Sequence, residues 1–121
     1  MTNQPSPPDN FSMQRGFELY RNGKPYAALV HFNFFMNLQP VTEEVVIAME
    51  MSGQIFREIG QLDPSLICLS NALKEVERLN APTLKASIEN NLEATVTARR
   101  KSRRHKGEEQ PPASWVVGLF L

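Results

Sequence analysis

The chain of 121 residues has one cysteine, one tryptophan and two histidines, and none of its apolar runs is long enough to cross a bilayer. Because Cys68 has no partner for an intrachain disulfide, we expect a reducing, cytoplasmic compartment. Residues 1–8 lack the basic start and the apolar run of a signal peptide, so they are interpreted as a flexible lead-in. A nuclear location stays open if the host is eukaryotic.

Patterns of catalytic and metal-binding residues are also missing. His31 and His105 are far apart, and no group of cysteines and histidines has the spacing of metal ligands. The sequence contains no glycine-rich phosphate loop and no nucleophile elbow. We therefore expect no metal site, no cofactor and no enzymatic activity.

What the sequence does contain is a strongly divided charge. Its 13 basic and 13 acidic residues cancel, but residues 1–98 hold 7 basic against 11 acidic residues. The other six basic residues lie within the run 98–106: Arg99, Arg100, Lys101, Arg103, Arg104 and Lys106. This run could bind nucleic acid or an acidic protein, or act as a nuclear import signal. Alternatively it is a solvated helix end whose cations suit the helix dipole.

Turn and capping signals divide the chain into five helical segments. We expect helices from Asp9 to about Asn22, from Pro25 to just before Pro40, from Thr42 to Gly60, from Asp63 to about Asn80, and over residues 83–104. The last segment has a narrow apolar stripe, typical of a helix that covers the end of a core. The prediction is an all-α domain over 9–104, with a linker over 105–112 and an apolar tail over 113–121.

Two stretches of the sequence share a ladder of positions. From Gly16, the positions at plus 3, 12, 16, 19 and 24 are Leu19, Ala28, Phe32, Phe35 and Pro40. From Gly53, the same offsets give Phe56, Ser65, Leu69, Ala72 and Glu77. Because glycine costs a helix about 1 kcal/mol relative to alanine, two glycines at matching positions predict close helix packing. We expect Phe32 and Leu69 to fill the space beside them.

This ladder resembles the tetratricopeptide repeat over residues 9–103. It departs from that family at Ser12, where a tryptophan is usual, at the bulky Phe35, and in the offset of 37 residues between Gly16 and Gly53 instead of about 34. The resemblance implies a degenerate array of about two repeats plus a capping helix, with five helices stacked as antiparallel hairpins. An unrelated five-helix bundle is the alternative.

The resemblance also implies a binding groove, which the first helix of each hairpin lines. The residues it places there are Asn10, Met13, Phe17, Tyr20, Ile47, Glu50, Gln54 and Arg57. An apolar end and a polar end would suit an apolar peptide or helix of a partner protein, so an adaptor or small chaperone is expected. Met13 and Phe17 occupy the positions of the family's carboxylate clamp, which argues against recognition of chaperone tails. Alternatively, Phe17 and Tyr20 pack in the hairpin core.

The tail ASWVVGLFL is too short to span a bilayer, which needs about twenty residues. Its large apolar residues are Trp115, Val116, Val117, Leu119 and Phe120. Because a repeat array usually needs about three units, we expect this tail to cover apolar surface left open, within the chain or in a neighbouring copy as a homodimer. Alternatively it is a short linear motif for another protein.

Overall fold

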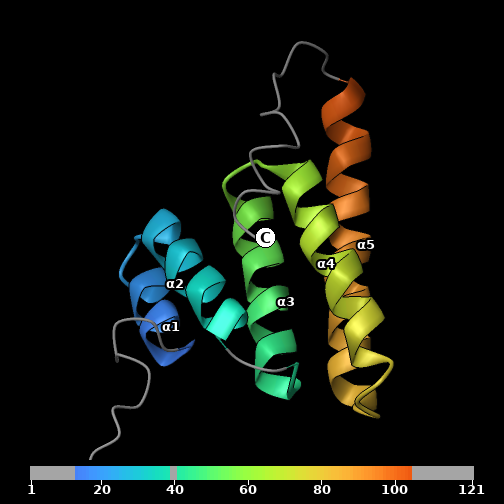
Figure 1. Ribbon diagram of the computed structural model, residues 1–121. Helices are drawn as coiled ribbons and strands as arrows, with labels where there is room; N and C mark the ends of the chain where they lie inside the picture. The colour runs from blue at the N-terminus through green and yellow to red at the C-terminus, as the bar shows by residue number, and fades with distance from the viewer. Residues whose placement is uncertain (1–12, 39–40, 105–121) are drawn as a thin grey trace, which may run out of the picture.

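A computed structural model describes residues 13–38 and 41–104 of the chain (Figure 1). These residues form five helices and no strand: α1 (Met13–Arg21), α2 (Pro25–Leu38), α3 (Glu43–Glu58), α4 (Leu62–Val76) and α5 (Pro82–Arg104). The all-α prediction is therefore confirmed, and the helices begin and end close to the expected residues. The expected cap at Asp9 lies outside the described residues.

The helices end where the backbone can reverse. Gly23 and Gly60 adopt φ values of 77° and 85°, and Asn80 adopts 52°, which are left-handed conformations suited to these residues. Thr42 caps α3 through its Oγ1, which accepts a hydrogen bond of 3.3 Å from the Val45 amide. α4 begins one residue before the expected Asp63, with Asp63 in its first turn.

Each helix packs against the next along the chain, and α3 also contacts α5. In Figure 1, α3 lies between the first hairpin, α1 and α2, and the pair of α4 and α5. The arrangement is a short stack of helical hairpins. The first helix is α1 in one hairpin and α3 in the other. α5 follows α4 at the position where the first helix of a third hairpin would come.

Gly16 and Gly53 have the same packing role, one in each hairpin. A Cβ atom on Gly16 would lie 2.7 Å from Cε1 of Phe32, and one on Gly53 would lie 2.6 Å from Cγ of Leu69. Both distances are too short for carbon atoms, so each hairpin closes only because its first helix lacks a side chain there. The expected close packing of Gly16 on Phe32 and of Gly53 on Leu69 is confirmed.

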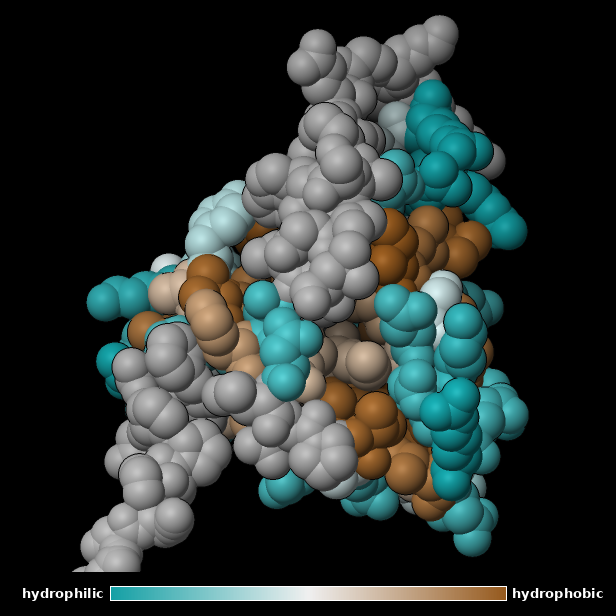
Figure 2. Space-filling view, viewed as in Figure 1, coloured by the Kyte–Doolittle hydropathy of each residue, from teal (hydrophilic) through white to brown (hydrophobic). Residues whose placement is uncertain are grey.

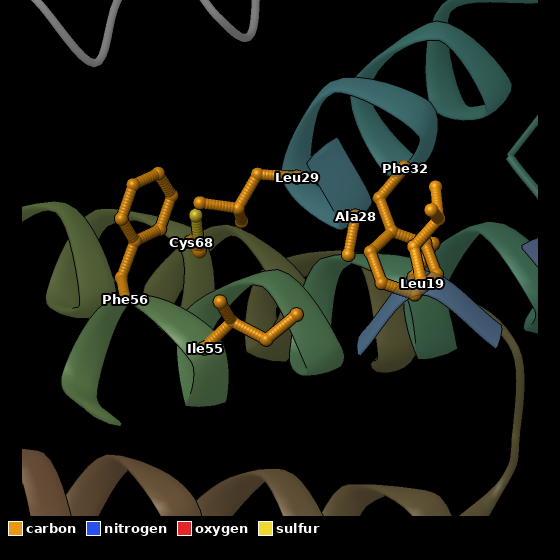
Figure 3. Packing of buried hydrophobic residues seen from close by; sticks show 8 residues of the cluster. Leu19, Ala28, Leu29, Phe32, Ile55, Phe56 and Cys68 are labelled. Atoms are coloured by element: carbon orange, nitrogen blue, oxygen red, sulfur yellow. The ribbon is translucent and has the colours of Figure 1, made fainter. Parts of the chain in front are cut away.

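The buried apolar residues form two clusters. The larger one joins α1 to α4; in Figure 3, Leu29 of α2 points toward Cys68 of α4, while Phe32 lies over Leu19 of α1. The second cluster joins α3, α4 and α5 through Val46, Val76 and Ile88. Because the first cluster spans both hairpins, they are bound by a shared core and not only by their connecting segment.

α5 closes the second end of the stack. Ile88 is fully buried against α3 and α4, whereas Glu89, Asn90 and Glu93 on the outer side are exposed. No large apolar side chain of α5 is exposed, as expected of a capping helix. The exposed large apolar side chains of the described residues lie on α2 and just after it, and they are Tyr26, Val30, Phe34 and Val41.

Candidate interaction surfaces

The surface expected to form a groove begins on α1. Met13, Phe17 and Tyr20 are half-buried and pack against the edge of the first apolar cluster. The ring of Phe17 meets the ring of Phe32 edge-on, with centroids 5.4 Å apart and an interplanar angle of 80°. These three residues thus contribute to the hairpin core, as the alternative interpretation expected of Phe17 and Tyr20, and still present part of their surface.

A polar bridge connects α1 to α3 on this surface. The Tyr20 hydroxyl donates a hydrogen bond of 2.6 Å to Oε1 of Glu58, and Gln54 Nε2 donates one of 3.1 Å to Oε2 of the same carboxylate. The bond to Glu58, together with desolvation, raises the pKa of Tyr20 above its usual value, because ionisation would place two negative charges side by side. Tyr20 and Gln54, two of the expected groove residues, are thus brought together through Glu58.

Arg57 points from α3 to α5. Its Nη1 donates hydrogen bonds to the Asn91 carbonyl at 3.0 Å and to Thr95 Oγ1 at 3.2 Å, and its Nη2 donates to Asn91 Oδ1 at 3.0 Å. The Arg57 guanidinium therefore ties the capping helix to the second hairpin. Any partner would meet it as part of this network and not as a free cation.

Glu50 completes the network about two turns of α3 before Arg57. It is only 8% exposed, and its Oε2 accepts hydrogen bonds from Ser87 Oγ at 2.5 Å and from Asn91 Nδ2 at 2.7 Å. Asn91 thus bridges an acidic and a basic side chain of α3. Ile47, the remaining expected groove residue, is half-buried on the same face of α3.

Two fully buried hydroxyls extend the network into α4. Ser65 Oγ donates a hydrogen bond of 2.7 Å to the Gly53 carbonyl and lies 2.9 Å from Thr95 Oγ1. Thr95 Oγ1 donates a hydrogen bond of 3.1 Å to the Asn91 carbonyl and accepts one from Arg57. The sequence ladder marked Ser65 as a small residue; its hydrogen bonds to α3 and α5 depend on tertiary contacts that spacing does not reveal.

The basic run continues α5 past the start of α4. Arg99 Nε lies 2.8 Å from Asp63 Oδ1, and Arg99, Arg100 and Arg103 line one recess with Leu66 and Val96. The structure therefore brings three of the expected basic residues together. Lys101 is exposed, and Arg104 ends the helix.

Other expected positions fall outside the described residues. These are Asn10, Lys106, and the tail residues Trp115, Val116, Val117, Leu119 and Phe120. In the described part of the chain, no group of three or more histidine, cysteine, aspartate or glutamate side chains could hold a metal ion. None of the five helices is long and apolar enough to cross a membrane.

Comparisons of the chain with protein-family models, with curated proteins and with solved structures found no match.

Proposed function

We propose that the chain is a protein-interaction module, an adaptor or small chaperone, that holds an apolar peptide or helix of a partner on the faces of α1, α3 and α5. The observation that carries the proposal is the bridge from Tyr20 through Glu58 to Gln54, which makes one surface from the first helices of two hairpins. We also propose that these hairpins are degenerate tetratricopeptide repeats, supported by the matched glycines.

The surface has two chemically different ends. At one end, Met13 and Phe17 of α1 supply apolar area. At the other end, next to α5, lie Arg57 and Glu50 of α3, and both form hydrogen bonds with Asn91. An apolar side chain of the partner would anchor at the first end, and polar contacts at the second would set its direction. The buried Cys68, which has no disulfide partner, is compatible with a cytoplasmic setting.

Capture of a partner from a cell extract by the tagged full chain, with identification by mass spectrometry, tests the proposal. Tyr20→Ala and Ile47→Ala should each weaken capture, because both side chains lie on the proposed surface. Tyr26→Ala and Val30→Ala are matched controls, since both residues are exposed on other parts of the stack. Equal capture by all four variants, with helical content unchanged by circular dichroism, would remove the proposed surface.

A second candidate function is binding of nucleic acid by the basic run, favoured by the three arginines around one recess. Affinity would then fall steeply with salt, because bound phosphates release counterions. Replacement of Arg99, Arg100, Arg103 and Arg104 by glutamine should abolish binding of nucleic acid. A wild-type chain that fails to bind a nucleic-acid column at low salt would eliminate this candidate.

A further inference from the structure

A second apolar surface lies away from the proposed partner site, in a groove bounded by α2, α3 and α4. Its apolar lining consists of Met36, Val41, Val45, Met49 and Cys68. Two amides, those of Asn37 and Asn71, also line it, and no charged residue does. On the face shown in Figure 2, hydrophobic residues lie among hydrophilic residues, both at its edges and toward its centre.

This α2–α4 groove has a cavity volume of about 140 Å³. An engineered apolar cavity of about 150 Å³ in another protein accepts benzene, so the α2–α4 groove has room for one aromatic side chain. It lies on a different side of α3 from Ile47 and Glu50, since at about 100° per residue Val45 and Met49 are about 100° to 160° away from them around the helix. An occupant here would leave the proposed partner surface open.

We propose that residues 113–121 of the same chain dock in the α2–α4 groove, with the Trp115 ring filling it. This segment, ASWVVGLFL, has no charged residue, and neither has the lining of the groove. A charged occupant would lose its hydration there without gaining a partner of opposite sign, whereas this segment would not.

The end of α5 places this segment within reach. Arg99 pairs with Asp63, so α5 ends beside the start of α4. From that pair, Arg104 lies about 7.5 Å further along α5 and Cys68 about 7.5 Å along α4 in the other direction, at 1.5 Å per residue. With neighbouring helix axes about 10 Å apart, the path is roughly 20 to 30 Å. Residues 105–114, ten in number, span up to about 33 Å.

The groove adds no ordering cost of its own to docking. Ordering the nine residues of the segment opposes docking, whereas burial of their large apolar side chains favours it. A groove already formed by α2, α3 and α4 needs no ordering of its own, so this cost falls on the segment alone. Binding of a partner on a different side of α3 is a separate event, and either proposal can fail without the other.

Trp115 is the only tryptophan, so its fluorescence reports on this segment in the full chain. The folded wild-type chain should emit at a shorter wavelength than the chain unfolded in urea. Met49→Lys and Asn71→Lys, which place a charge in the groove, should shift the emission toward that of the unfolded chain. Val30→Lys, on an exposed side of α2 outside the groove, should leave it unchanged.

Two results would overturn the proposal. One is a wild-type emission equal to that of the unfolded chain, which would mean that Trp115 stays in water. The other is a shift caused by Val30→Lys but not by the two groove variants, which would put the segment on the exposed side of α2. Circular dichroism of each variant separates loss of docking from loss of fold.

A disulfide tests whether docking occurs within one chain. Cys68 is buried and burial raises the pKa of its thiol, so the test uses a Cys68→Ser, Asn71→Cys, Ser114→Cys variant, which keeps Trp115 and has one cysteine at an exposed position of the groove lining and one in the segment. Mild oxidation should yield an intrachain disulfide that migrates as a monomer on a non-reducing gel. A disulfide-linked dimer, together with a dimeric mass for the wild type in light scattering, would show exchange between copies instead.

Discussion

Gly53 and Leu69 approach so closely that a Cβ atom on Gly53 would lie 2.6 Å from Cγ of the leucine. Gly16 and Phe32 stand in the same relationship, also 16 residues apart, at 2.7 Å. In each hairpin the absent side chain of the first helix makes room for the largest buried side chain facing it from the second. The two hairpins thus use one packing solution with different residues, a phenylalanine in one and a leucine in the other.

Gly53→Ala is expected to destabilise the fold by about 1 to 3 kcal/mol, because the new Cβ would lie 2.6 Å from Cγ of Leu69, which is fully buried. Helix propensity alone predicts the opposite, a gain of about 1 kcal/mol. Urea denaturation followed by circular dichroism measures the difference. Ser70→Ala, at an exposed position of α4, serves as a control with an effect near zero. A more stable Gly53→Ala chain would contradict the packing argument.

The sequence was sufficient to predict these hairpins because their signals are local. The turn glycines, the Thr42 cap and the repeated offsets from Gly16 and Gly53 each depend on residues near one another along the chain. The five helices and the pairing of helices within each hairpin follow from such signals.

The partners of polar side chains could not be predicted in this way. Arg57 was expected to face a groove, yet its guanidinium donates hydrogen bonds to Asn91 and Thr95, which are more than thirty residues away in the sequence. Spacing within α3 places Arg57 on a face, but it does not say that α5 passes beside that face. The same limit applies to Glu58, which became part of the candidate surface only through its bond to Tyr20.

Alkaline pH should weaken the link between α1 and α3. The pKa of Tyr20 is raised in the folded chain by the Glu58 carboxylate, so the folded state holds this proton more tightly than the unfolded state. The stabilisation is complete below the unfolded pKa of about 10 and is lost as the pH rises through the higher folded value.

A Tyr26→Phe chain isolates this effect, since Tyr20 and Tyr26 are the only tyrosines. Ultraviolet absorbance titration of this variant should give a pKa above that of free tyrosine, whereas Tyr20→Phe, which keeps the exposed Tyr26, provides the comparison. Between about pH 9 and pH 11, roughly the range around the free tyrosine pKa, the melting temperature of the Tyr26→Phe chain should fall more than that of the Tyr20→Phe chain. Equal titration of the two tyrosines would contradict the importance of the Glu58 bond.

Arg99→Gln should change the free energy of unfolding by less than about 1 kcal/mol. Its partner Asp63 and Arg99 itself are more than a third exposed, and ion pairs in such positions contribute little. Thermal melts at low and high salt check this, with Lys101→Gln as an exposed basic control on the same helix turn. A large loss would mean that the end of α5 is held mainly by this ion pair, and that charge variants of the basic run cannot be interpreted as binding variants alone.

Asn91→Ala should lower the free energy of unfolding by much more than the small size of the removed side chain indicates, because it weakens the packing of α5. Asn91 is the side chain that connects Arg57 to Glu50, so its removal deprives two charged groups of a hydrogen-bond partner at once. A lost partner of a buried polar group costs about 1 to 3 kcal/mol, and more for charged groups, so we expect a total of roughly 2 to 4 kcal/mol in urea denaturation. Asn90→Ala is the matched control, because Asn90 is the same residue type one position earlier and faces solvent. Hydrogen exchange should localise the loss to amides of α5, since Ile88 would keep its apolar contacts with α3 and α4 while the polar side of that interface opened. If Asn91→Ala and Asn90→Ala had equal effects, the apolar cluster around Ile88 alone would be holding α5 in place.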